Sequence, residues 1–549
     1  MTIQKSGNEI TRRALLGAVA AGAVGGPLLA GCSTKSSVAQ QGAISRSKDL
    51  AALVPKYVPV TYVKPDLPSA EGSSPGYSVY PQNLVQSVKS KPASGGTYTA
   101  LTPAFWPIPP GLGHNDYYDA VNSALGATIK FNIVNGNDYG PKIAAVLASK
   151  QVPDLTCLPL WNKPQNFSAG VSTLFADLTD YLRGDISSKW PNLANLPTLA
   201  WEYSVWNGRL YGLPFPGGGI ADGCLYRADL FAKLGVSPPT SADDWLALAK
   251  AINKPAKKRW ACGDVFEEVR RMYAVPPNWV RRNGKLVNGI ETEEYVEALT
   301  FNRKLFANGY VHPSIVGGNT ADAKQLFESG QMLMYEDGLG AWHEALERQR
   351  PGNPSFKMEV FPPFAAAADA DPVYYKGSPA GIMSFIKKGT PKDKIEELLG
   401  VMNYIAAPVG TQEYDLIIYG PRGKDNTIDS HGAPVLNTQG KKEVTYTYGF
   451  LIGRPDATVE PQYPDYVKDY HAWQVSATKH VVTGLLDGLN VEEPPKFQSL
   501  QKPLDDKVSD ISRGRAPISD WKKTVATWRS QGGDRLRAFY EKQLAKAGR

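Results

Sequence analysis

The segment from residue 96 to residue 158 alternates between strand and helix patterns, and this alternation limits the folds that are open to the chain. Its strands are short and rich in β-branched or aromatic residues, and its helices carry apolar residues three or four positions apart. The predicted order is strand 96–101, helix Asp116–Leu125, strand 129–134, a helix with Pro141 in its first turn, and strand 155–158. We therefore expect an α/β protein built on a parallel sheet.

Aromatic and polar residues follow two of these predicted strands. Trp106 comes after the first strand, and Trp161 and Asn162 come after the third. Ligands of parallel sheets bind beyond the carboxyl ends of the strands. A tryptophan ring offers a flat apolar face to a pyranose, and an amide can hydrogen-bond a sugar hydroxyl. These three residues are candidate ligand contacts, with core packing for the rings and a turn role for Asn162 as the alternatives.

The N-terminal segment has the pattern of an export signal. The pair Arg12-Arg13 precedes a Gly/Ala-rich apolar run that ends in Leu29-Ala30-Gly31-Cys32. The run is too short and too mildly apolar for a membrane-spanning helix. The arginine pair resembles a twin-arginine export signal, and the last four residues resemble the lipobox of bacterial lipoproteins. We predict a signal peptide over residues 1–31 and a lipid on Cys32 that anchors the protein to the outer face of the cell membrane. The alternative is a secreted protein with a chance cysteine.

Residues 32–95 have the composition of a flexible linker. They contain seven prolines and many Ser, Gln, Ala and Lys residues, with little sustained periodicity. Such composition favours extended chain. We expect this segment to hold a folded domain away from the membrane surface.

Charge and composition exclude several other functions. The formal net charge is +7 over 549 residues, and basic residues are interspersed with acidic ones, so no nucleic-acid-binding surface is predicted. The six histidines show no metal-ligand spacing, and no phosphate-binding glycine loop is present, so we expect neither a metal nor a cofactor. If Cys32 is lipidated, three cysteines remain. Whether Cys224 and Cys262 form a disulfide cannot be deduced from their spacing.

Five motifs occur in an order that resembles a known family. They are residues 207–214 (NGRLYGLP), 225–236 (LYRADLFAKLGV), 239–252 (PTSADDWLALAKAI), 326–338 (LFESGQMLMYEDG) and 384–390 (SFIKKGT) followed by a helix. Together they resemble the extracellular solute-binding proteins of ABC importers, the family that includes maltose-binding protein. The end of the chain, residues 528–544, resembles the longer lipoprotein branch of that family. The resemblance runs from about Gly96 to the C-terminus.

The resemblance implies a two-lobed α/β fold, like that of periplasmic binding proteins, with the ligand in a cleft between the lobes. Lobe one is expected over 96–214 plus 377–445 and lobe two over 219–373 plus 446–549, with hinge crossings near 214–216, 372–373 and 447–448. It also implies a monomer without enzymatic activity that captures a solute, most simply a sugar or oligosaccharide. The permease subunits of an ABC transporter would be its partners.

Further ligand contacts are implied by the same resemblance. Glu336 and Asp337 lie in a glycine turn that matches a family position before an aromatic residue facing the cleft, and Trp342 is the nearest tryptophan, offset from that position. Trp279 lies in a Pro-Pro-Asn-Trp loop of the expected lobe two. Arg422 lies in a loop that resembles one of the lipoprotein branch, where it would meet an acidic sugar or the solvent. For Glu336 and Asp337 the alternative is a solvated turn that contacts no ligand.

Three other functions stay open at the level of the sequence. The solute could be a peptide or another non-sugar compound, since such sites are also aromatic. A glycoside hydrolase would need two carboxylates about 5–9.5 Å apart, and no catalytic motif points to such a pair. The third is an adhesion lipoprotein that binds carbohydrate without a transporter.

Overall fold

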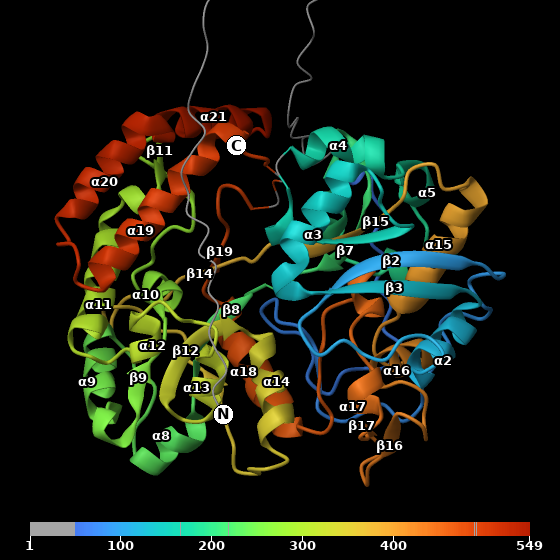
Figure 1. The fold of residues 1–549 in the computed structure, drawn as a ribbon, viewed down its shortest axis with the longest axis horizontal. Coiled ribbons are helices and arrows are strands. Elements are labelled where there is room, and N and C mark those ends of the chain that lie inside the picture. The colour runs from blue at the N-terminus through green and yellow to red at the C-terminus, as the bar shows by residue number, and fades with distance from the viewer. Residues whose placement is uncertain (1–49, 165, 218, 488, 490) are drawn as a thin grey trace, which may run out of the picture. The chain divides into compact units, whose positions relative to one another are not determined.

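The computed structural model describes residues 50–549 apart from 165, 218, 488 and 490. The export signal, including Arg12, Arg13 and Cys32, lies outside the described residues. Within them, no helix combines the length and apolarity that a membrane span requires. Two β-sheets, each with its own helices and buried core, form two lobes. Lobe one carries β2 and β3 in Figure 1, and lobe two carries α9 and β9.

Lobe one is built on a five-stranded sheet of order β3-β2-β4-β15-β7. The first three strands are parallel and are joined by helices, as the strand–helix alternation predicts, and β15 runs antiparallel to both β4 and β7. The strands are β2 (Thr97–Ala104), β3 (Thr128–Asn135), β4 (Leu155–Pro159), β7 (Gly212–Pro216) and β15 (Ala380–Ile386). The helices are α2 (Asp116–Leu125), α3 (Gly136–Ser149), α4 (Phe167–Leu174), α5 (Thr179–Leu182), α6 (Pro191–Ala194), α7 (Thr198–Glu202), α15 (Lys392–Ile405), α16 (Gln412–Tyr419) and α17 (Gly440–Glu443).

Lobe two is built on a four-stranded sheet of order β13-β8-β12-β9. β12 runs antiparallel to β8 and parallel to β9, so its carboxyl end meets the start of β8. The strands are β8 (Asp222–Tyr226), β9 (Trp260–Cys262), β12 (Met332–Gly338) and β13 (Glu359–Val360). The helices are α8 (Ala228–Leu234), α9 (Ala242–Ile252), α10 (Phe266–Met272), α11 (Glu293–Ala307), α12 (Pro313–Val316), α13 (Ala323–Glu328), α14 (Gly340–Gln349), α18 (Pro464–Thr478), α19 (Gln501–Ser512), α20 (Asp520–Trp528) and α21 (Asp534–Lys546).

Short strand pairs complete the fold. The hairpin β5 (Val205–Trp206) to β6 (Arg209–Leu210) turns at Asn207 and Gly208, whose φ angles are 52° and 73°. Positive φ at both central residues is what a two-residue hairpin requires, so the Asn-Gly pair predicts this turn correctly. The other pairs are β1 (Gly76–Tyr77) with β18 (Thr458–Val459), β10 (Trp279–Arg282) with β11 (Lys285–Asn288), β14 (Tyr374–Tyr375) with β19 (Val481–Val482), and β16 (Asn426–Ile428) with β17 (Pro434–Leu436).

The chain passes between the lobes at three places: from β7 to β8, from β14 to β15, and after the 3-10 turn at Tyr448–Phe450. Tyr448 and Leu451 are buried in the core of lobe one, and Tyr466 in that of lobe two. The third connection therefore follows residue 452, a few residues later than the predicted crossing at 447–448.

Residues 50–95 do not behave as the flexible linker that their composition predicts. Val54 and Tyr80 are buried, and the Val88 N–H donates to the Glu413 carboxylate at 2.7 Å. β1 pairs with β18, almost four hundred residues later. The apolar residues between the prolines find partners on both lobes: Val54 is buried in the core of lobe one and Leu67 packs against the core of lobe two. Composition alone does not reveal these contacts.

The three cysteines of the described chain are free thiols. Cys157, Cys224 and Cys262 are fully buried in sheet strands. Burial raises the pKa of each thiol. Cys224 and Cys262 are therefore two separate thiols in the core, and no disulfide joins them.

Candidate functional site

A pocket of about 430 Å³ lies where the two lobes meet. Lobe one contributes the end of β7, the helix α16 and residues 444–446, and lobe two contributes the first turn of α14 and the helix α18. The segment 454–460, which connects the lobes, forms the rest of the wall. The main lining residues are Phe215, Pro216, Leu339, Gly340, His343, Tyr414, Ile417, Tyr446, Arg454, Asp456, Glu460, Tyr466 and Tyr470.

A row of aromatic rings leads from the end of β2 to this pocket. Trp106 stacks on Phe450, with ring centroids 5.7 Å apart and an interplanar angle of 5°. Phe450 in turn meets Tyr446 edge to face at 5.6 Å, and Tyr446 meets Phe215 at 6.0 Å. The Ser384 hydroxyl donates to the Phe450 carbonyl at 2.9 Å and fixes this turn on the sheet. We call Trp106, Phe450, Tyr446 and Phe215 the aromatic row.

Arg454 is the cation of the pocket. Its guanidinium lies 5.4 Å from the ring centroid of Tyr414 and 5.5 Å from that of Tyr446. Its Nε is buried and has no hydrogen-bond partner, and within the described chain Arg454 forms no ion pair. Cation–π contacts hold the side chain in place without neutralising its charge.

The acidic and imidazole groups of the pocket are desolvated. Burial raises the pKa of Glu460 to about 8, and the charge of Glu347 adds to this effect. Burial lowers the pKa of His343. Both groups are therefore mostly neutral at pH 7. The carboxylate of Asp456, a third group of the pocket, accepts a hydrogen bond from the Ser74 hydroxyl.

Glu336, one of the predicted contacts, lies in an ionic cluster at the carboxyl end of β12. Its carboxylate accepts from the N–H groups of Glu267 (2.9 Å) and Glu268 (3.2 Å) in the first turn of α10. Arg271 lies 3.3 Å from it and also pairs with Glu268 and Asp222. Burial nevertheless raises the pKa of Glu336 to about 8, and the like charges of the neighbouring glutamates add to this. The cluster joins β8, β12 and α10.

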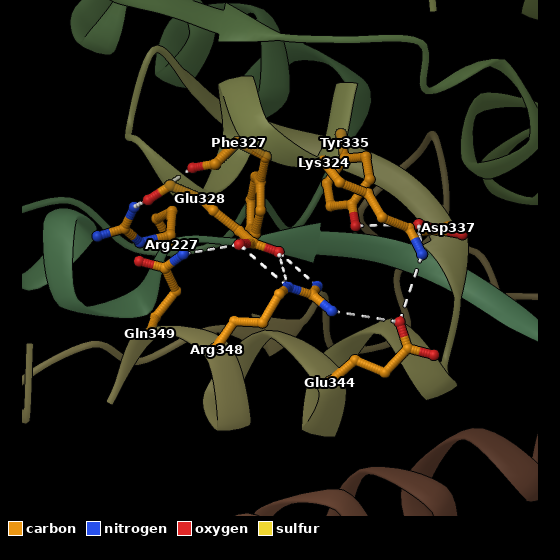
Figure 2. Close-up of polar contacts among 9 residues, drawn as sticks. All are labelled: Arg227, Lys324, Phe327, Glu328, Tyr335, Asp337, Glu344, Arg348 and Gln349. Atoms are coloured by element: carbon orange, nitrogen blue, oxygen red, sulfur yellow. Dashed lines mark hydrogen bonds and ion pairs between the residues drawn. The ribbon is translucent and has the colours of Figure 1, made fainter. Parts of the chain in front are cut away.

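Asp337, the next residue, belongs to a different network, which Figure 2 shows. Its carboxylate accepts from the Tyr335 hydroxyl at 3.0 Å and lies 3.5 Å from Lys324, which also reaches Glu344. Arg348 pairs with Glu328 and lies 3.6 Å from Glu344. These contacts link α13 to β12 and α14. The contacts that the structure gives for Asp337 therefore lie within lobe two.

Two predicted aromatic contacts lie in the core of lobe two. Trp342 is 2% exposed, and its ring meets Tyr466 and Tyr470 edge to face. Trp279 is 5% exposed and packs on Trp528 and Tyr540. Trp279 also borders a pocket of about 710 Å³ that lies wholly within lobe two. The packing of Trp342 leaves no ring face for a ligand.

The remaining predicted contacts belong to lobe one. Trp161 and Asn162 form a 3-10 turn at the end of β4, and the Trp161 side chain is 63% exposed. Arg422 pairs with Asp415 at 2.8 Å, and Asp415 also accepts from the Tyr80 hydroxyl. Arg422 is therefore already neutralised, and it is not among the residues that line the pocket.

The structure thus brings one predicted residue, Trp106, onto the aromatic row that enters the pocket. Sequence reasoning missed Phe215, Tyr446 and Arg454. Their one available signal is their position at the predicted crossings between lobes, since Phe215 ends β7 and the other two flank the third connection. The described residues contain no group of three or more His, Cys, Asp or Glu side chains that could hold a metal ion.

The fold and the pocket define a class: a two-lobed α/β protein with a site where the lobes meet. The sequence model of the family described as bacterial extracellular solute-binding protein matches residues 117–410, more than half of the chain. The chain belongs to this family.

Two curated relatives come from Bacillus subtilis (strain 168). The polygalacturonan/rhamnogalacturonan-binding protein YtcQ is 21% identical over 428 residues, which cover 74% of this chain and 83% of YtcQ. Lipoprotein LipO is 24% identical over 210 residues, which cover 35% of this chain and 40% of LipO.

Solved structures share the fold at low sequence identity. A solute-binding protein from Bifidobacterium longum infantis, described as binding HMO, superposes with a TM-score of 0.61 at 15% identity and covers 83% of this chain and 99% of its own. The alginate-binding protein AlgQ2, solved without calcium ion, gives a TM-score of 0.56 at 14% identity and covers 85% of this chain and 100% of its own.

Proposed function

We propose that this protein captures a sugar or oligosaccharide in the pocket between its lobes and delivers it to the permease of an ABC transporter. The observation that carries the proposal is that two rings of the aromatic row, Phe215 and Tyr446, line one pocket together with Arg454, Asp456 and Glu460. Flat rings next to a few fixed polar groups match the amphipathic surface of a sugar. YtcQ, which aligns with 74% of the chain, is named for binding polygalacturonan and rhamnogalacturonan.

Capture would work by closure of the two lobes. The three connections between them would act as the hinge, and the predicted contacts Trp161, Asn162, Glu336 and Asp337 would belong to the two walls that approach each other. A ligand can favour the closed state only through contacts that the open state lacks. A permease would then distinguish loaded from empty protein by the changed outer surface.

The protein would act outside the cytoplasm as a monomer anchored by a lipid on Cys32. The Arg12-Arg13 pair and the lipobox support this placement. Cys32→Ala should release the protein into the medium, and Lys at both arginines should retain it in the cytoplasm. Recovery of the Cys32→Ala variant in the membrane fraction would contradict the anchor.

A ligand screen tests the function itself. The mature protein would be titrated by calorimetry and thermal shift with mono- and oligosaccharides, and with peptides as a second panel. A ligand at a hundred times its Kd should add about 2.7 kcal/mol of stability. Shifts with peptides alone would instead indicate a peptide receptor.

Chromatography of the sugars after long incubation tests whether the protein is an enzyme. We expect the sugars to be recovered intact, because the proposed site captures its ligand without chemistry. Cleaved products would indicate a glycoside hydrolase.

Deletion of a neighbouring permease gene tests the adhesion alternative. Normal sugar uptake after this deletion would favour an adhesion role for the protein.

A further inference from the structure

Arg454 forms no ion pair in the described chain, in contrast to three other arginines of the two lobes. Arg422 pairs with Asp415, Arg271 with Glu268, and Arg227 with Asp229. Arg454 instead makes one long contact, 3.5 Å from its Nη2 to the Tyr446 hydroxyl oxygen. In the part of the chain that the structure describes, no carboxylate or carbonyl accepts from it.

The surroundings of Arg454 make this lack of a partner costly. The side chain is half-buried, its Nε is shielded from solvent, and two tyrosine rings flank its guanidinium. A guanidinium in such a place needs an anion or several acceptors to offset the lost hydration. The two tyrosines supply no anion and only one long acceptor contact, from the Tyr446 hydroxyl, and their π-faces attract the cation without neutralising its charge.

Other groups of the pocket do not supply the missing negative charge. Glu460 and His343 are mostly neutral at pH 7 for the reasons given above. Asp456 is directed to the Ser74 hydroxyl and forms no ion pair with Arg454. The pocket therefore holds a fixed cation that faces a space of about 430 Å³ large enough for sugar residues.

We propose that Arg454 binds a carboxylate of the captured saccharide, so that the preferred ligands are oligosaccharides that contain uronic acids. This inference rests on the proposed function and narrows it to one substrate class. A planar guanidinium can bind a carboxylate through two parallel hydrogen bonds, which a neutral hydroxymethyl group cannot reproduce. The adjoining aromatic row would take the apolar faces of the same sugar chain.

Matched pairs of sugars test the inference. The mature protein would be titrated by calorimetry with galacturonate, glucuronate and mannuronate trisaccharides and with the neutral trisaccharide of each pair. We expect at least one acid to bind tenfold or more tightly than its neutral counterpart, and this preference to weaken as salt is raised. Sulfated trisaccharides form a third arm, and tighter binding of these than of every uronate would overturn the carboxylate assignment.

Variants locate the preference at Arg454. Arg454→Gln should abolish the difference in affinity between acid and neutral sugar, and Arg454→Lys should keep part of that difference. Arg422→Gln is the matched control, because that arginine is already paired outside the pocket, and it should keep the full preference. Thermal melts of each variant confirm folding.

Two further results would overturn the inference without touching the proposed function. One is equal or tighter binding of neutral sugars in every pair, and the other is an acid preference that survives in folded Arg454→Gln. Binding of no sugar of either kind, together with binding of peptides, would instead remove the proposed function on which the inference rests.

Discussion

The carboxylate of Glu492, in lobe two, accepts hydrogen bonds from the backbone N–H groups of Phe167 at 2.8 Å and Ser168 at 3.2 Å, in lobe one. Ser168 adds its hydroxyl as a third donor. The two backbone donors belong to the first turn of α4, where the helix dipole also favours an anion. The neighbouring Glu493 accepts from the Tyr540 hydroxyl at 2.6 Å within lobe two. Two successive glutamates thus join the C-terminal helices to the other lobe.

We predict that Glu492→Ala shifts the lobes towards wider separation. Hydrogen bonds to a charged group contribute about 1.5–3 kcal/mol each, so the equilibrium between closed and open forms should move by tenfold or more. Small-angle scattering should show a larger radius of gyration, and the Kd for any ligand that closes the lobes should rise. Glu493→Ala is the control, because it removes a bond inside lobe two and should leave the scattering profile unchanged. Identical scattering profiles for Glu492→Ala and wild type would show that the hydrogen bonds of Glu492 do not hold the lobes together.

Trp106 and Trp342 should respond in opposite ways to substitution. Trp342→Ala removes a buried ring and should lower the free energy of unfolding by about 3–5 kcal/mol, as large core truncations do. Trp106 is half-buried and is the first ring of the aromatic row, so Trp106→Ala should weaken ligand binding at least tenfold with a smaller loss of stability. Urea unfolding and calorimetry separate the two effects. Undiminished affinity in Trp106→Ala would remove the aromatic row from the site.

Glu460 should make stability fall as the pH rises. Its pKa is about 8 in the folded protein, above the ordinary value of 4.5, so the folded state binds this proton more tightly than the unfolded state does. The resulting stabilisation is complete below about pH 4.5 and is lost as the pH rises towards 8. The change should be on the order of a few kcal/mol, because each unit of pKa difference corresponds to about 1.4 kcal/mol.

Unfolding curves check the predicted fall in stability. They would be measured at several pH values between 5 and 9 for wild type and for Glu460→Gln. The amide cannot ionise, so the free energy of unfolding of the variant should fall less between pH 5 and pH 9. The variant should therefore be more stable than wild type at pH 9. Parallel pH profiles for the two proteins would show that Glu460 is not the group responsible. Glu336, whose pKa is also raised, contributes a similar decline in both proteins.

The buried pair of Arg227 and Asp229 should matter far more than an exposed pair. Both side chains are almost inaccessible, at 5% and 6% exposure, and two hydrogen bonds of 2.8 Å join them. Asp229→Ala leaves the buried guanidinium without its carboxylate and should cost about 3–5 kcal/mol. The exposed pair of Lys502 and Asp506 is the control, and Asp506→Ala should cost less than about 1 kcal/mol. Denaturant titrations of the two variants measure both, and equal losses would contradict the role of burial.

Features that depend on neighbouring residues could be derived from the sequence. The strand–helix alternation of residues 97–159, the Asn207-Gly208 hairpin and the Ser241 cap of α9 all follow from local periodicity, turn chemistry and capping. Two local boundaries were wrong. β2 continues to Ala104 instead of ending at residue 101, and its last residues still pair with β3. α3 begins at Gly136 rather than near Pro141, because Asn135 accepts from the Asn137 N–H and starts the helix a turn earlier.

The sequence by itself determined the α/β class, the family and the position of Trp106 beyond a strand end, because these depend on residues close together along the chain. Only the tertiary structure decided that residues 50–95 pack on the two lobes, that Trp342 is buried in the core, and that Arg422 is ion-paired while Arg454 is not. Burial and pairing depend on which distant segments meet, as Phe215, Tyr446 and Tyr466 do at the pocket, and no local pattern records that meeting.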